Sequence, residues 1–132
     1  MMKPPSKREA LLLELLIAGR KGISQLDILS SNRFQPHQRR DRYCSWNLSS
    51  DISKLRREYG LSITRQTEAY KSNSGRVVTC KRYRIPDCAS AQRIVNLINR
   101  LRRLRKAPLM ECKRSSYLVS EFAGPEVMTN EK

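Results

Sequence analysis

Side chains able to form hydrogen bonds with another molecule are concentrated in one stretch, residues 47–59, which reads NLSSDISKLRREY. If this stretch is helical, five amide, hydroxyl and cationic side chains fall on one side of it: Asn47, Ser50, Ser53, Lys54 and Arg57. Such groups form hydrogen bonds with nucleic-acid bases, and Lys and Arg also neutralise phosphate charge. A helix that exposes them is suited to reading base edges in the major groove of DNA.

The opposite side of this stretch indicates how the helix is held. Four side chains share one narrow helical face at spacings of four, three and four residues: Leu48, Ile52, Leu55 and Tyr59. Asn47 is a suitable N-cap, and Gly60 stands where a left-handed C-terminal cap needs a residue without Cβ. We therefore expect a helix over Asn47–Tyr59 with a buried back and a donor-rich front.

A hairpin is expected directly after this helix. Leu61–Arg65 alternates apolar and polar residues, as a half-buried strand does. Ala69–Gly75 is a polar segment rich in turn-forming residues. The return strand runs from about residue 76 to residue 85 and ends before Pro86, because proline cannot donate a hydrogen bond to a sheet ladder.

The positive charge of the chain far exceeds what solubility requires. The 132 residues carry a net charge of +15. Residues 1–106 hold 24 Lys and Arg against 8 Asp and Glu, whereas residues 107–132 hold 3 against 4. The charge therefore belongs to the folded part, and a basic domain attracts a polyanion such as double-stranded DNA. Lys71 and Arg76 flank the turn of the expected hairpin, so we expect residues 66–76 to meet the DNA backbone or the minor groove.

The N-terminal part predicts two further helices. After a disordered segment over residues 1–5, helices are expected from Lys7 to about Ala18 and from Gln25 to about residue 31, each opened by a capping box. Gly19–Gly22 is expected to be a loop, and Ile23 is expected to form a short strand that pairs with the hairpin.

The segment over residues 32–45, NRFQPHQRRDRYCS, is longer than the turn that joins the two helices of a helix-turn-helix. Its charge comes mainly from arginine, and three of these are candidate DNA contacts: Arg39, Arg40 and Arg42. Two interpretations stay open for it. The segment is either a solvated surface loop or an arm that lies along DNA phosphates.

The C-terminal part predicts a long helix over about residues 89–106. Apolar residues form a seam along it: Ile94, Leu97, Ile98, Leu101 and Leu104. The seam either packs on the rest of the domain or forms the contact of a homodimer. The domain would then span residues 6–106. Residues 107–132 have no apolar periodicity and are expected to be a flexible tail, with a short strand or docking segment around Tyr117–Val119.

Other classes of chemistry have little support. The four cysteines, at positions 44, 80, 88 and 112, match no zinc-ligand spacing, so we expect free thiols, no metal and no cofactor. The chain has no Gly-rich phosphate loop and no pattern of nucleophile and base, so we do not expect an enzyme. No apolar run reaches the ~18 residues of a membrane-spanning helix, and no signal-peptide cleavage site is recognisable. We expect a cytoplasmic protein, in the nucleoid or in the cytoplasm of a host cell.

Taken together, the expected elements are helix, short strand, helix, helix, strand, turn and strand. With Trp46, Leu48, Ile52, Leu55 and Arg56 in the spacing W-x-L-x-x-x-I-x-x-L-R, the chain resembles the small winged helix-turn-helix proteins of bacteriophages and prophages. Ile63 and the segment KRYRI over residues 81–85 fit the same pattern. The resemblance covers residues 8–85, and the long segment over residues 32–45 departs from it.

This resemblance implies an α+β fold, mainly α, with a three-helix core and a two-stranded wing hairpin, to which this chain adds a C-terminal helix. It also implies sequence-specific DNA binding through the helix at residues 47–59. The leading hypothesis is a phage- or prophage-type transcriptional regulator, or an accessory factor of recombination or replication. The alternative is a protein-interaction module of the same fold that binds and inhibits or redirects a host protein. The positive charge favours DNA.

Overall fold

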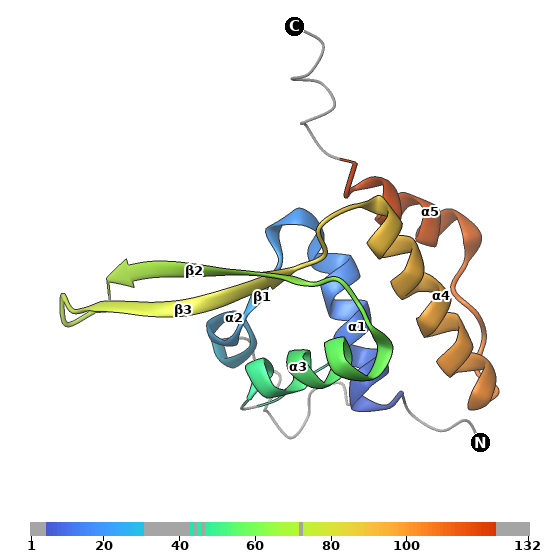
Figure 1. Cartoon of the computed structure of the whole chain (residues 1–132), viewed down its shortest axis with the longest axis horizontal. Coiled ribbons are helices and arrows are strands. Elements are labelled where there is room, and N and C mark those ends of the chain that lie inside the picture. The colour runs from blue at the N-terminus through green and yellow to red at the C-terminus, as the bar shows by residue number, and fades with distance from the viewer. Residues whose placement is uncertain (1–4, 31–42, 44, 46, 72, 124–132) are drawn as a thin grey trace, which may run out of the picture.

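The computed structural model describes residues 5–30, 43, 45, 47–71 and 73–123. The elements of this part of the chain are α1 (Lys7–Ala18), β1 (Ile23–Ser24), α2 (Gln25–Ser30), α3 (Leu48–Tyr59), β2 (Thr64–Lys71), β3 (Val77–Arg84), α4 (Cys88–Leu104) and α5 (Cys112–Ser120). A 3-10 turn over Gly19–Lys21 follows α1. The helices form one body, from which the β2–β3 hairpin projects (Figure 1). The fold is α+β and mainly helical, as the sequence predicts.

Capping residues fix where the helices begin. At the start of α2, Ser24 Oγ accepts a hydrogen bond from the Asp27 amide at 3.2 Å, and Asp27 Oδ2 accepts one from the Ser24 amide at 3.1 Å. This capping box is the one that the sequence predicts. The box predicted for α1 is only half formed: Ser6 Oγ caps the Glu9 amide, but the Glu9 carboxylate is turned toward arginines of α4.

The three strands form one antiparallel sheet in the order β1–β3–β2. Ile23 pairs with Tyr83 and Ser24 with Arg82, so the short strand expected at Ile23 is confirmed. Thr64 pairs with Arg84 at one end of the hairpin and Lys71 with Val77 at the other. The outer half of the hairpin pairs only β2 with β3, which is why it extends beyond the helices (Figure 1).

The predicted bounds of the first hairpin strand are wrong. The strand expected over residues 61–65 begins only at Thr64 and continues to Lys71, through part of the predicted turn. Leu61 and Ile63 are buried, 8% and 4% exposed, but they lie outside the sheet ladder. They alternate with the exposed Ser62 because the connection from α3 to β2 buries these two side chains. The chain turns between Lys71 and Val77 instead.

The core is built around α1. Leu11, Leu12, Leu15 and Leu16 are each at most 1% exposed, because α1 contacts α4, α5, β1 and β3. The same cluster takes in side chains from the sheet and from α3, α4 and α5. Burial of an aliphatic side chain stabilises a fold by about 1.5–3 kcal/mol, so α1 is the element on which the others depend most.

The apolar seam of α4 packs within the chain. Ile94 and Ile98 are fully buried and Leu97 is 8% exposed. Leu101 is half-buried, and Leu104 is 74% exposed at the last turn. The main part of the seam therefore contributes to the core, and its C-terminal end at Leu104 is exposed.

Residues 107–123 differ from the flexible tail that was expected. They include the helix α5, so the strand predicted around Tyr117–Val119 is wrong, whereas the alternative of a docking segment there agrees with the packing of α5 on α1 and α4. Met110, Leu118 and Phe122 are buried in the core, at 8%, 8% and 2% exposure. Leu118 lies within the nine-residue helix, whereas Met110 and Phe122 flank it, eight and four positions from Leu118, so the helix itself shows little apolar periodicity. The tail beyond residue 123 lies outside the described residues.

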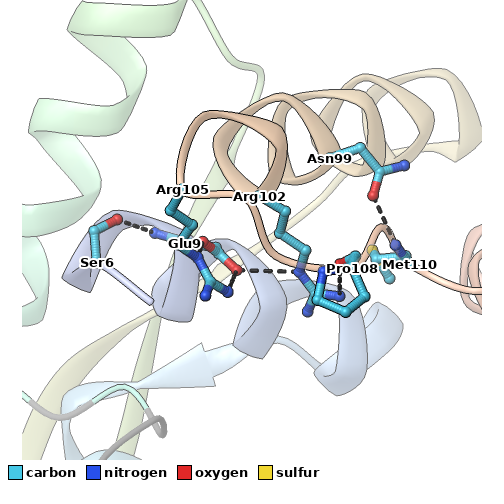
Figure 2. A network of polar contacts seen from close by, with 7 residues as sticks. All are labelled: Ser6, Glu9, Asn99, Arg102, Arg105, Pro108 and Met110. Atoms are coloured by element: carbon cyan, nitrogen blue, oxygen red, sulfur yellow. Dashed lines mark hydrogen bonds and ion pairs between the residues drawn. The ribbon is translucent and has the colours of Figure 1, made fainter. Parts of the chain in front are cut away.

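A buried carboxylate fixes α4 on α1 (Figure 2). The side chain of Glu9 is 3% exposed and accepts hydrogen bonds from Arg102 Nε at 3.1 Å and from Arg105 Nη2 at 2.7 Å. Burial by itself raises the pKa of Glu9, but the hydrogen bonds and charges of Arg105 and Arg102 together outweigh it. The pKa is therefore lower than its ordinary value of 4.5. Nearby, Asn99 Oδ1 accepts a hydrogen bond from the Met110 amide at 2.9 Å, which anchors the chain before α5.

Glu9→Gln should lower the free energy of unfolding by about 1–3 kcal/mol at neutral pH, because two half-buried guanidinium groups lose their counter-charge. A depressed pKa stabilises the fold above the ordinary pKa, and the contribution disappears as pH falls through the folded value. The difference between wild type and variant, measured by urea unfolding, should therefore shrink below pH 4.5. Glu58→Gln, which removes an exposed pair with Arg8, is the control and should cost less than about 0.5 kcal/mol. An equal loss in both variants would contradict the assignment.

Gly22 is required where β1 approaches β3. Its φ is +74°, and a Cβ placed there would lie 2.4 Å from the carbonyl oxygen of Tyr83 and 2.8 Å from Cβ of Arg84. Gly60 has a similar φ of +62°, but a Cβ there would meet nothing within 4 Å. A side chain at position 60 would therefore meet backbone strain alone, whereas one at position 22 would meet both backbone strain and steric contact.

Gly60→Ala should lower the free energy of unfolding by about 1–2 kcal/mol, the cost of the left-handed conformation alone. Gly22→Ala should cost roughly 2 kcal/mol more, because the β1–β3 pairing must also open. Thermal and urea unfolding of the two variants measure the difference. Equal destabilisation would show that β1 does not approach β3 this closely.

Candidate nucleic-acid interface

The orientation of α3 follows from its caps and its buried stripe. Asn47 Oδ1 accepts a hydrogen bond from the Ser50 amide at 3.1 Å, and Gly60 is the left-handed C-cap, as predicted. Leu48, Ile52 and Leu55 are each at most 1% exposed. The side of α3 opposite these three residues therefore faces solvent.

The residues predicted for DNA binding on α3 divide into two groups. Ser53, Lys54 and Arg57 are exposed on the solvent side. Ser50 is half-buried, and the side-chain oxygen of Asn47 is already used in capping. On α3, the site prediction missed the exposed Arg56, which lines a shallow groove together with Ser53, Arg57, Gly60 and Leu61. The sequence analysis used Arg56 only for the resemblance, and its place beside Ser53 and Arg57 is evident from the exposed groove.

Three contacts from three other elements hold α3. At its start, Gln25 of α2 accepts a hydrogen bond from the Leu48 amide at 2.6 Å and donates one to the Ser45 carbonyl at 2.8 Å. In its last turn, Arg8 of α1 lies 3.2 Å from the Glu58 carboxylate and donates to the Tyr59 hydroxyl at 3.1 Å. The contact with Tyr59, and then the charge of Glu58, raise the pKa of Arg8, so its guanidinium stays charged.

The third contact comes from α4, where Arg93 Nη2 donates to the Gly60 carbonyl at 3.2 Å.

Between α1 and α3 lies a cavity of ≈170 Å³ lined by Lys7, Arg8, Leu11, Asp51, Lys54 and Leu55. Small-molecule sites commonly occupy about 300–1,000 Å³, so this cavity is small for a metabolite or cofactor. The exposed faces of α3 and of the hairpin are better candidates for a binding site.

The segment before α3 contributes to the core. Tyr43 is 1% exposed, and its hydroxyl donates a hydrogen bond to Asp51 Oδ2 at 2.6 Å, beside Lys7 at 3.6 Å from the same oxygen. The end of the long segment over residues 32–45 is thus packed against α3. The candidate DNA contacts Arg39, Arg40 and Arg42 lie outside the described residues, so the arm and the surface loop both stay open.

The two faces of the hairpin differ in charge. The pairing of Arg65 with Tyr83 and of Thr67 with Lys81 places Arg65, Lys81 and Lys71 on one face, which bears no acidic residue. On the other face Arg82 is neutralised by Glu68 and by Asp27 of α2, each at 2.8 Å. The predicted contacts Lys71 and Arg76 are exposed. Arg65 and Lys81 were missed, because the strand register that unites them with Lys71 depends on where the hairpin turns.

The described residues hold no group of three or more His, Cys, Asp and Glu side chains that could bind a metal ion. Within the same part of the chain, Cys80, Cys88 and Cys112 are free. Among the helices described, none is long and apolar enough to cross a membrane.

Gln25→Ala should lower the free energy of unfolding by about 1–3 kcal/mol, because the Leu48 amide and the Ser45 carbonyl both lose a partner at a half-buried position. Gln92→Ala is the matched control, since Gln92 Nε2 bonds only across the exposed surface of α4 to Asn96 at 3.0 Å. It should cost less than about 0.5 kcal/mol. Chemical unfolding measures both. If the two variants are equally stable, the Gln25 amide does not hold the start of α3.

Comparison with protein-family models, curated proteins and solved structures found no match to this chain.

Proposed function

We propose that this protein binds double-stranded DNA, with α3 in the major groove and the β2–β3 hairpin on the backbone or in the minor groove. The observation that carries the proposal is the exposed face of α3. Ser53, Lys54 and Arg57 stand opposite the buried stripe of Leu48, Ile52 and Leu55. A major groove about 12 Å wide admits a helix in this orientation.

The arrangement of elements supports a winged helix-turn-helix as the finer description of the fold. The chain order α1, β1, α2, α3, β2, β3 and the sheet order β1–β3–β2 are those expected of it. Gln25 joins the start of α3 to α2, so the second and third helices have a defined relation despite the long segment between them. In the fold that we propose, the β2–β3 hairpin is the wing.

The distribution of charge supports DNA over the alternative of a protein-binding module. The chain carries a net charge of +15, and the acid-free face of the hairpin presents Arg65, Lys71 and Lys81. A site of this kind gains affinity by neutralising phosphates and releasing counterions. Within DNA binding, we propose the role of a phage- or prophage-type transcriptional regulator, or of an accessory factor in recombination or replication.

Selection of bound fragments from random duplex DNA tests whether the binding is sequence-specific. The proposal expects a recovered consensus sequence, because a helix in the major groove meets a distinct pattern of donors and acceptors at each base pair. Enrichment without a consensus would leave only phosphate attraction and would contradict base reading by α3. A consensus with two-fold symmetry would in addition identify a dimer.

Arg57→Ala and Lys71→Ala should have different effects on the affinities for a selected and a scrambled duplex. Arg57→Ala should cost ~1–3 kcal/mol on the selected sequence and much less on a scrambled duplex, because a base contact is lost. Lys71→Ala should weaken both duplexes alike and make the salt dependence shallower by about one unit, because a phosphate contact is lost. Titrations on both duplexes at several salt concentrations measure this.

Arg114→Ala is the control for loss of one positive charge, because Arg114 is exposed on α5, away from α3 and the hairpin (Figure 1). It should change neither affinity by more than about 0.5 kcal/mol. If Arg57→Ala lowers both affinities equally, α3 does not read bases.

A further inference from the structure

A row of exposed arginines runs along one side of α4. Arg93, Arg100 and Arg103 are seven and three residues apart, and at about 100° per residue they share one side of the helix. Arg102 and Arg105 point elsewhere, because both bind the buried Glu9. We call Arg93, Arg100 and Arg103 the arginine row. It is distinct from the two arginines that fix α4 on α1.

The arginine row is continuous with the exposed face of α3. Arg93 donates to the carbonyl of Gly60, the C-cap of α3. Gly60 in turn borders the groove that Arg56 and Arg57 line. Glu58 is the acidic residue in the last turn of α3, and Arg8 already neutralises it at 3.2 Å. Among the residues described, cationic surface therefore extends from α3 onto α4, and the Glu58 carboxylate is paired.

The arginine row lies at the opposite end of the molecule from the hairpin. Figure 1 shows the hairpin projecting on one side of α3 and α4 standing on the other. From Arg93 to Arg103 the helix rises about 15 Å. One DNA strand presents a phosphate every ~3.4 Å along the axis, so this length covers about four phosphates.

We propose that the arginine row binds backbone phosphates of the same duplex that α3 enters, on the flank of the site opposite to the hairpin. This inference rests on the proposed function and extends the contact beyond the helix and the wing. The hairpin would contact one flank of the site, α3 its centre and α4 the other flank. Helix α4 would then be part of the DNA-binding surface as well as part of the core.

The test removes charge from the row while keeping its packing. Arg100→Gln with Arg103→Gln changes two exposed side chains, whereas Arg93 is kept because it also binds Gly60. The control, Lys113→Gln with Arg114→Gln, removes the same charge from α5, which packs on α4 and lies away from α3. Binding of the full chain to a mixed-sequence duplex of about 24 base pairs is measured by fluorescence anisotropy at several salt concentrations.

The plot of log affinity against log salt should become shallower by about two units in the α4 variant, and by much less in the control. Arg100→Lys with Arg103→Lys should keep the wild-type slope, because phosphate contact depends on charge. Equal changes in the two glutamine variants would overturn the inference, since overall charge alone would then explain them. An unchanged α4 variant beside a weakened Arg57→Ala would also overturn it, while leaving the proposed function intact. If the wild type does not bind duplex DNA at all, both fail together.

Discussion

The burial of three side chains on α3 determines which of its residues can meet another molecule. Leu48, Ile52 and Leu55 are each at most 1% exposed. Turning the helix about its axis would bring them into water at a cost of about 1.5–3 kcal/mol for each. Because helical positions are related by a fixed rotation, Ser53, Lys54 and Arg57 must then face solvent. The functional face of α3 is thus a consequence of core packing.

The rest of the domain holds this orientation from several directions. Gln25 of α2 binds the first turn, Arg8 of α1 binds the last turn, and Arg93 of α4 binds the C-cap. The position of α4 in turn depends on the Glu9 carboxylate of α1. A displacement of α1 would therefore be transmitted to the last turn and the C-cap of α3, directly through Arg8 and indirectly through α4. In this respect α1 acts as the scaffold of the candidate interface, although no residue of it was expected to contact DNA.

Local chemistry allowed much of the fold to be predicted. The caps at Asn47 and Gly60 depend on residues one turn away or less, and the strand at Ile23 could be inferred from the order of the elements. The predictions failed where distant residues decide. Leu61 and Ile63 are buried without strand pairing, and α5 is held by burial of Leu118 and Phe122 in a core built by other helices.

Prediction of the candidate site from the sequence is limited in the same way, because distant residues decide part of it. Ser53, Lys54 and Arg57 were predictable because one periodic pattern places them opposite Leu48, Ile52 and Leu55. Arg65 and Lys81 join Lys71 only through the register of the hairpin. The pairing of Glu9 with Arg102 and Arg105 joins residues more than 90 positions apart and has no local signature. Sequence alone could not show which arginines of α4 are used inside the domain and which remain outside.

The most direct test of the central claim is to methylate guanine N7 with dimethyl sulfate on a selected duplex, with and without the protein. Guanine N7 lies on the floor of the major groove, so a helix inserted there blocks it. The account predicts protection of N7 at the centre of the site, opposite α3. If the protein binds the duplex but N7 is fully methylated throughout the site, α3 does not occupy the major groove.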